Sequence, residues 1–189
     1  SMTLQPAKFD KALVAGYFFI EPKSNIWNCR KEQIIAKGYP RYDWLKKSTE
    51  EAKQLYQNVK SNHKKVIVWM PTFRNDKNGT LNDVANITQF PLMANNADWE
   101  KLDKHCNDKG VKLLIKLHPL QKNYDIKWEL YKNIMLIDSD TFSNAGTTMY
   151  QFLAVTDGLI TDYSSIGVDY MIVNKPIAFT LDDYELYKD

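Results

Sequence analysis

Three short segments of this 189-residue chain carry side chains that could hold a phosphate group, namely Arg74, His118 and the pair Ser164–Ser165. A guanidinium can contact a phosphate through two parallel hydrogen bonds, and an imidazole can donate one hydrogen bond or, when protonated, neutralise charge. The serine pair adds hydroxyl donors at the expected start of a helix, where backbone N–H groups attract anions. Taken alone, Arg74 also fits a surface ion pair, and His118 fits a histidine that is hydrogen-bonded to a neighbouring carbonyl. The serine pair alone also fits a helix cap. Their coincidence favours a diphosphate ligand.

Other kinds of site are disfavoured by the sequence. The net charge is only +2, and the basic residues are scattered, which argues against a nucleic-acid-binding protein. Cys29 and Cys106 lie far apart without a CxxC motif, so we expect neither a disulfide framework nor a structural zinc site, and a reducing cytoplasm is the favoured compartment. Glycine-rich phosphate motifs are absent. We expect no metal and no cofactor.

The candidate residues each follow an apolar run that predicts a strand. The five predicted strands alternate with helical patterns and cover residues 66–70, 113–117, 134–137, 158–161 and 176–179. Uniformly apolar strands that alternate with helices are typical of an α/β fold, a Rossmann-like parallel sheet with helices on both faces. Ligands of such sheets bind beyond the carboxyl ends of the strands. We therefore expect the three polar segments at one edge of the sheet.

The remaining polar and aromatic candidates have simpler interpretations. Lys116 interrupts an apolar strand, and we expect its ammonium to reach solvent rather than a ligand. His63 and His105 lie in polar surroundings and are expected at the surface. The tryptophans and tyrosines favour packing in the core over a stacking platform. Gly110 follows an expected helix over residues 99–106 in the position favoured after a helix end.

Four segments resemble the CDP-glycerol glycerophosphotransferase family of teichoic-acid and related wall or capsule polymer synthesis. They are GYPRYDWL (38–45), VIVWMPTFR (66–74), LLIKLHP (113–119) and DGLITDYSSIGVDYMIVNKP (157–176). The similarity is collinear over roughly residues 9 to 189. The last segment, together with the preceding His-Pro pair, is specific, whereas Pro-Thr-Phe-Arg is only supportive.

This resemblance implies the C-terminal half of a two-domain GT-B fold. Residues 1–42 would be the tail of a truncated N-terminal acceptor-side domain and the interdomain passage. Residues 43–189 would be the donor-nucleotide-binding Rossmann-like domain, with an incomplete C-terminus. The domain that carries the acceptor-side histidine base in family members would be missing, so the resemblance implies that this chain alone binds nucleotide without turnover.

The resemblance also implies a reaction. An acceptor hydroxyl would attack the β-phosphorus of CDP-glycerol, or of a relative such as CDP-ribitol, and release CMP. By the family's motifs, His118 would be catalytic and, together with Arg74, would carry the diphosphate charge, with Thr72 at the same substrate-binding site. Ser164 and Ser165 would hold the β-phosphate, and Asp162 would orient the turn or a ligand hydroxyl. The acceptor would be lipid-linked or a polymer, and the parent enzyme would lie at the cytoplasmic face of the membrane, attached through parts outside this chain.

Two other functions remain open from the residues. One is a GT-B transferase with a CMP-sugar or other nucleotide-sugar donor, such as a capsule sialyltransferase-like enzyme, because a His-Pro pair and a serine turn also occur there. The other is a non-catalytic α/β nucleotide-binding module. A receiver-like module would carry a cluster of acids at the strand ends, whereas this edge is rich in Arg, His and Ser.

Overall fold

The computed structural model describes residues 8–72, 90, 92–93, 95–117, 126–182 and 184–187. The chain divides into two compact units, Ser1–Trp44 and Leu45–Asp189. This division lies close to the predicted boundary after residue 42. That the first unit is part of an acceptor-side domain stays a prediction.

The first unit contains a two-stranded parallel sheet. β1 (Ala12–Val14) pairs with β2 (Ile34–Ala36), and the segment between the strands forms η1 (Tyr17–Phe19), α1 (Ile20–Trp27) and η2 (Lys31–Gln33). Val14 and Ile34 are buried, whereas Tyr17 and Phe18 are exposed. α2 (Tyr42–Lys46) contains the boundary with the second unit.

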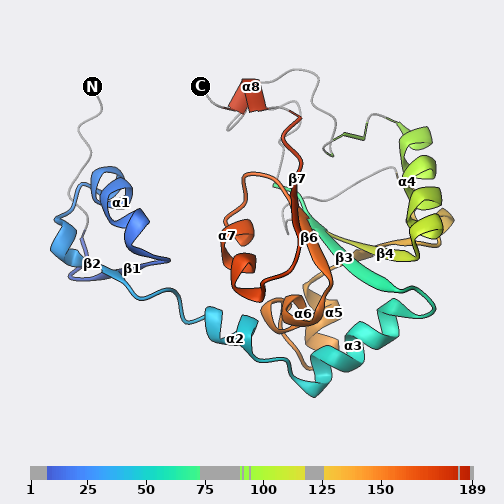
Figure 1. Cartoon of the computed structure of the whole chain (residues 1–189), viewed down its shortest axis with the longest axis horizontal. Helices are drawn as coiled ribbons and strands as arrows, with labels where there is room; N and C mark the ends of the chain where they lie inside the picture. Colours follow the sequence, from blue (N-terminus) through green and yellow to red (C-terminus); the bar gives the residue numbers. More distant parts are fainter. Residues whose placement is uncertain are drawn as a thin grey trace. The chain divides into compact units, whose positions relative to one another are not determined.

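The second unit is built on a five-stranded parallel sheet (Figure 1). Its strands are β3 (Lys65–Met70), β4 (Val111–Lys116), β5 (Ile134–Ile137), β6 (Gly158–Thr161) and β7 (Ile177–Phe179). The order across the sheet is β5-β4-β3-β6-β7, so the chain moves outward from β3 to β5 and then returns to the other side of β3. The predicted α/β fold and its five strands are confirmed. The switch point, where ligands bind in such sheets, lies between β3 and β6.

Helices cover both faces of this sheet. The helices of this unit are α3 (Glu50–Lys60), α4 (Asn96–Lys109), α5 (Ser139–Asn144), α6 (Met149–Val155), α7 (Ile166–Tyr170), η4 (Met171–Val173) and α8 (Tyr184–Tyr187), with η3 (Trp128–Leu130) before β5. Figure 1 shows α4 on one side of the sheet and α3, α5 and α6 on the other. Residues alternate along β3 accordingly, since Trp69 belongs to the core under α4 while Val68 is buried outside that cluster.

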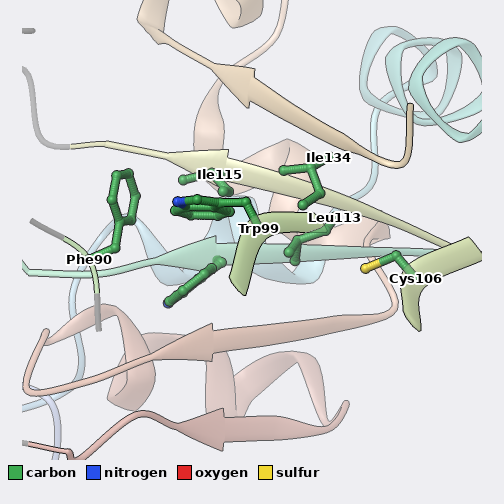
Figure 2. Close-up of a cluster of buried hydrophobic side chains, with 7 residues drawn as sticks. Phe90, Trp99, Cys106, Leu113, Ile115 and Ile134 are labelled. Atoms are coloured by element: carbon green, nitrogen blue, oxygen red, sulfur yellow. The ribbon is translucent and has the colours of Figure 1, made fainter. Parts of the chain in front are cut away.

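The core under α4 is rich in aromatic side chains (Figure 2). Its buried members are Trp69, Phe90, Trp99, Cys106, Leu113, Ile115 and Ile134. The ring of Trp99 packs edge-on against those of Phe90 and Trp128, each with ring centroids 5.0 Å apart. The expectation that aromatic residues serve packing is confirmed for Trp69 and Trp99.

Helix ends follow local capping signals, including two that we did not predict. Gly110 ends α4 with a positive φ of 65°, as expected. The apolar spacing of Leu45, Ala52 and Val59 predicts a single helix, but the structure has two, because Thr49 begins a new helix by accepting a hydrogen bond from the Ala52 N–H. The polar stretch after β5 is the helix α5, which Asp138 caps.

Two polar connections anchor the amino-terminal side of the sheet. The carboxylate of Asp157 accepts hydrogen bonds from the Tyr56 hydroxyl (2.7 Å) and the Val66 N–H (2.8 Å). The surface prediction for His63 is wrong, since it is half-buried with its ring nitrogens 2.9 Å from the Lys60 carbonyl oxygen and from Asn133 Oδ1. The fold places Asn133, the residue before β5, beside the turn that contains His63. Local polarity in the sequence does not reveal this long-range contact. His105 is exposed, as expected.

The two thiols are expected to react at very different rates. Burial, with a smaller contribution from the Asp103 carboxylate, raises the pKa of the Cys106 thiol to about 11, and its thiolate, the reactive form, therefore forms in the native state only near that pH. Cys29 is only partly buried. At pH 7.5 a maleimide should label Cys29 and spare Cys106 until the chain unfolds, as peptide mass spectrometry would show. Rapid native labelling of a Cys29→Ser variant would contradict this.

Candidate functional site

The site is assembled at the carboxyl ends of β3 and β6, on the two sides of the switch point. Thr72 lies two residues beyond β3, and Asp162, Ser164 and Ser165 directly follow β6. The two strands are hydrogen-bonded neighbours, with Met70 in register with Thr161. Four of the six predicted site residues are therefore brought to one edge of the sheet.

Asp162 connects the two loops of the switch point. The residue is 3% exposed, and both carboxylate oxygens accept from the Thr72 backbone N–H, Oδ2 at 2.8 Å and Oδ1 at 3.0 Å. One residue earlier, the Thr161 hydroxyl donates to the Met70 carbonyl oxygen (2.8 Å). We call these contacts of Thr161 and Asp162 with Met70 and Thr72 the rim clamp. The clamp holds the β3 loop against the β6 turn.

The rim clamp is itself supported from β7. The Thr180 N–H donates to the Thr161 carbonyl oxygen at 2.8 Å, and the Thr180 hydroxyl approaches the same oxygen at 3.2 Å. Thr161 is fully buried and Thr180 nearly so. Because buried polar groups are costly unless hydrogen-bonded, these pairings favour a single arrangement of the three strand ends.

The serine turn differs from a simple helix cap. Ser165 already has helical backbone angles (φ −59°, ψ −17°), and its side chain makes no capping hydrogen bond to α7. Ser165 is exposed and Ser164 half-buried, with the Ser164 Oγ at 3.5 Å from the Ile166 N–H. The side chain of Ser165 therefore does not cap the helix, although capping was the alternative interpretation of the serine pair. Its hydroxyl lies at the surface, at the same edge as Thr72.

Two residues that we did not single out in the sequence position this turn. At Gly167, a Cβ atom would lie 3.2 Å from Cε1 of Phe179 and 3.3 Å from Cγ2 of Thr161, so glycine lets α7 approach the strands closely. Asp169 is 1% exposed and accepts a hydrogen bond from the Tyr150 hydroxyl (3.1 Å), which joins α7 to α6. The sequence signal for these two residues was a glycine and an acidic residue within a helical pattern.

Arg74 and His118, the two predicted cationic residues, lie outside the described residues. The described chain reaches Thr72 on the β3 side and Leu117 on the β4 side. β4 is the neighbour of β3 opposite β6, and both strands end at the same edge of the sheet. Their side-chain roles stay predictions.

The charged groups at the end of β4 and β5 differ in their surroundings. Burial lowers the pKa of Lys116, and the Asp138 carboxylate partly offsets that effect. Hydrogen bonds from Thr141, first from its side chain and then from its backbone, lower the pKa of Asp138.

In the part of the chain that is described, no group of three or more His, Cys, Asp or Glu side chains could hold a metal ion, and no helix is long and apolar enough to span a membrane.

Comparison with protein-family models identifies the family to which this chain belongs. The model of the CDP-glycerol:poly(glycerophosphate) glycerophosphotransferase family matches residues 1–189. The chain belongs to this family. The resemblance found in the sequence motifs is confirmed, and members of this glycerophosphotransferase family are transferases by name.

Curated relatives of this chain are teichoic-acid enzymes. Teichoic acid ribitol-phosphate polymerase TarK from Staphylococcus aureus is 30% identical over 196 residues, which cover 99% of this chain and 35% of the relative. Teichoic acid glycerol-phosphate primase from Bacillus subtilis is 30% identical over 160 residues, covering 84% and 36%. The chain thus spans about a third of the length of these relatives.

Solved structures show the same fold. The wall teichoic acid polymerase TagF superposes with a TM-score of 0.70 at 26% identity, covering 95% of this chain and 41% of that chain. A variant of TagF soaked with CDPG matches with a TM-score of 0.67 at 25% identity and the same coverage. The Rossmann-like, GT-B-type fold expected from the sequence is confirmed.

Proposed function

We propose that this chain is the donor-binding part of an enzyme that transfers glycerol phosphate from CDP-glycerol to a lipid-linked or polymer acceptor and releases CMP. The rim clamp is the observation that carries this proposal. It joins the loop that leads to Arg74 with the turn that carries Ser164 and Ser165, at the edge where open α/β sheets bind ligands. Family membership supplies the substrate class.

In the proposed reaction, the acceptor hydroxyl oxygen attacks the β-phosphorus of the donor. The bond between that phosphorus and the bridging oxygen breaks, CMP leaves with the electron pair, and the hydroxyl proton passes to a base. Such transfers depend mainly on positioning and on stabilisation of negative charge. Ser164 and Ser165 would hold the β-phosphate, and Arg74 and His118 would neutralise the diphosphate.

The identity of the polyol is the finer part of this proposal. Relatives are named for both ribitol phosphate and glycerol phosphate, and the TagF crystal soaked with CDPG favours the glycerol donor. A lipid-linked acceptor and attachment to the cytoplasmic face of the membrane through other parts of the enzyme complete the proposal. A CMP-sugar donor is the main competing possibility.

Calorimetric titration tests the donor directly. The chain should bind CDP-glycerol, or CDP-ribitol, more tightly than CMP-sialic acid or a UDP-sugar. A His118→Ala variant should bind the CDP donor about 10- to 100-fold more weakly, because one charge-assisted hydrogen bond contributes about 1.5–3 kcal/mol. His105→Ala, at an exposed position, is the matched control. Preference for a UDP-sugar would refute the proposed donor, and unchanged affinity in His118→Ala would remove that residue from the site.

A further inference from the structure

Lys116 is a partly covered cation at the ligand-binding edge of the sheet. It is the last residue of β4 and lies two positions before His118. Its side chain is half-buried rather than fully in water, so the sequence-based expectation that it simply reaches solvent describes it incompletely. A charged group in such a place is costly unless an anion compensates it.

Lys112, on the same strand, shows how the fold compensates such a charge elsewhere. The two lysines are four residues apart, so strand periodicity places their Cβ atoms on the same face. Burial also lowers the pKa of Lys112, but its ammonium donates to the Lys132 carbonyl oxygen at 2.6 Å, and the Asp103 carboxylate opposes the shift. Lys112 is thus satisfied within the protein.

No comparable partner is provided for Lys116 by the described residues. Asp138 acts on its charge through a coulombic interaction alone. The Asp138 carboxylate is instead committed to the start of α5, where Oδ1 accepts from the Thr141 N–H (2.8 Å) and hydroxyl (2.7 Å). Among the described residues, none therefore occupies the Lys116 ammonium with a hydrogen bond or an ion pair.

We propose that Lys116 is an additional contact for the phosphate oxygens of the nucleoside diphosphate donor. This inference rests on the proposed function, since it names a further residue of the same site. β4 lies next to β3, and about two strand spacings, or roughly 10 Å, separate it from β6 and the serine turn. The ammonium, a compact point charge, thereby extends the anion-binding edge to the β4 side of the switch point.

The test compares Lys116→Met with Lys112→Met by calorimetry on the full chain, with CDP as the probe. Lys116→Met should weaken CDP binding about tenfold while thermal unfolding stays close to wild type, and Lys112→Met should leave the affinity within about twofold. Lys116→Arg keeps the charge and should recover most of the affinity. If the wild type binds CDP and Lys116→Met binds it with the same affinity, the inference about Lys116 is overturned while the proposed function stands. Absence of CDP binding by the wild type would overturn the proposed function and, with it, the inference.

A measurement on the unaltered chain keeps the proposal testable if a variant does not fold. Acetylation of lysines by a limiting amount of reagent, followed by mass spectrometry, reports the accessibility of each ammonium. CDP should protect Lys116 severalfold and leave the modification of exposed Lys104 unchanged. Equal modification of Lys116 with and without saturating CDP would contradict the proposed contact.

Discussion

Asp162→Ala is expected to destabilise the second unit by about 2–3 kcal/mol and to weaken CDP binding at least tenfold. The carboxylate is buried and holds the Thr72 N–H with both oxygens. Hydrogen bonds to a charged group contribute about 1.5–3 kcal/mol, and a donor left without its partner adds a desolvation cost. Urea unfolding measures the first effect and calorimetry the second. Affinity falls because the β3 loop and the β6 turn are no longer held together.

Two further variants separate the clamp from a loss of charge in general. Asp162→Asn keeps an oxygen that can accept from the Thr72 N–H, so it should recover part of the lost stability and affinity. Asp108→Ala removes an exposed carboxylate and should change stability by less than about 0.5 kcal/mol. If Asp162→Ala unfolded at the same urea concentration as Asp108→Ala, the rim clamp would not hold the loops.

Trp99→Ala is expected to cost about 3–5 kcal/mol, the range for large aromatic truncations in a core. The side chain is 3% exposed and lies at the centre of the cluster under α4, in ring contact with Phe90, Trp128 and Trp69. Its removal would leave a cavity that a close-packed sheet and helix cannot fill. For a domain of ordinary stability this is a large share of the total. Chemical unfolding followed by circular dichroism gives the difference.

The matched control is another tryptophan in a different setting. Trp44 is 48% exposed, so Trp44→Ala should cost clearly less than Trp99→Ala. Trp99→Phe keeps a ring in the cluster and should fall between the wild type and Trp99→Ala. Similar losses for Trp44→Ala and Trp99→Ala would show that the α4 core does not dominate stability.

Much of the fold follows from local patterns in the sequence. Continuous apolar runs predicted all five strands of the large sheet, because strands covered on both faces need apolar residues at every position. Gly110 marked the end of α4 because its left-handed backbone suits glycine. The segment around Ser164, together with the preceding His118–Pro119 pair, was specific enough to indicate the family.

Other features depend on contacts that no local pattern contains. The polar run after β5 was not predicted as a helix, since its start depends on one cap at Asp138. His63 was assigned to the surface because its partner Asn133 is 70 residues away. The same holds for Asp169, whose burial reflects packing of α7 against α6.

The amino-acid sequence by itself determined the α/β class and the family, because strand periodicity, capping residues and motif residues are all local properties. Only the tertiary structure decided that β3 lies between β4 and β6, and hence that Asp162 meets the Thr72 N–H across 90 residues of sequence. Strand order is set by which apolar faces pack together, and that choice is made by long-range contacts. The role of Asp162 as a clamp and the half-buried position of Lys116 at the end of β4 become visible at that level.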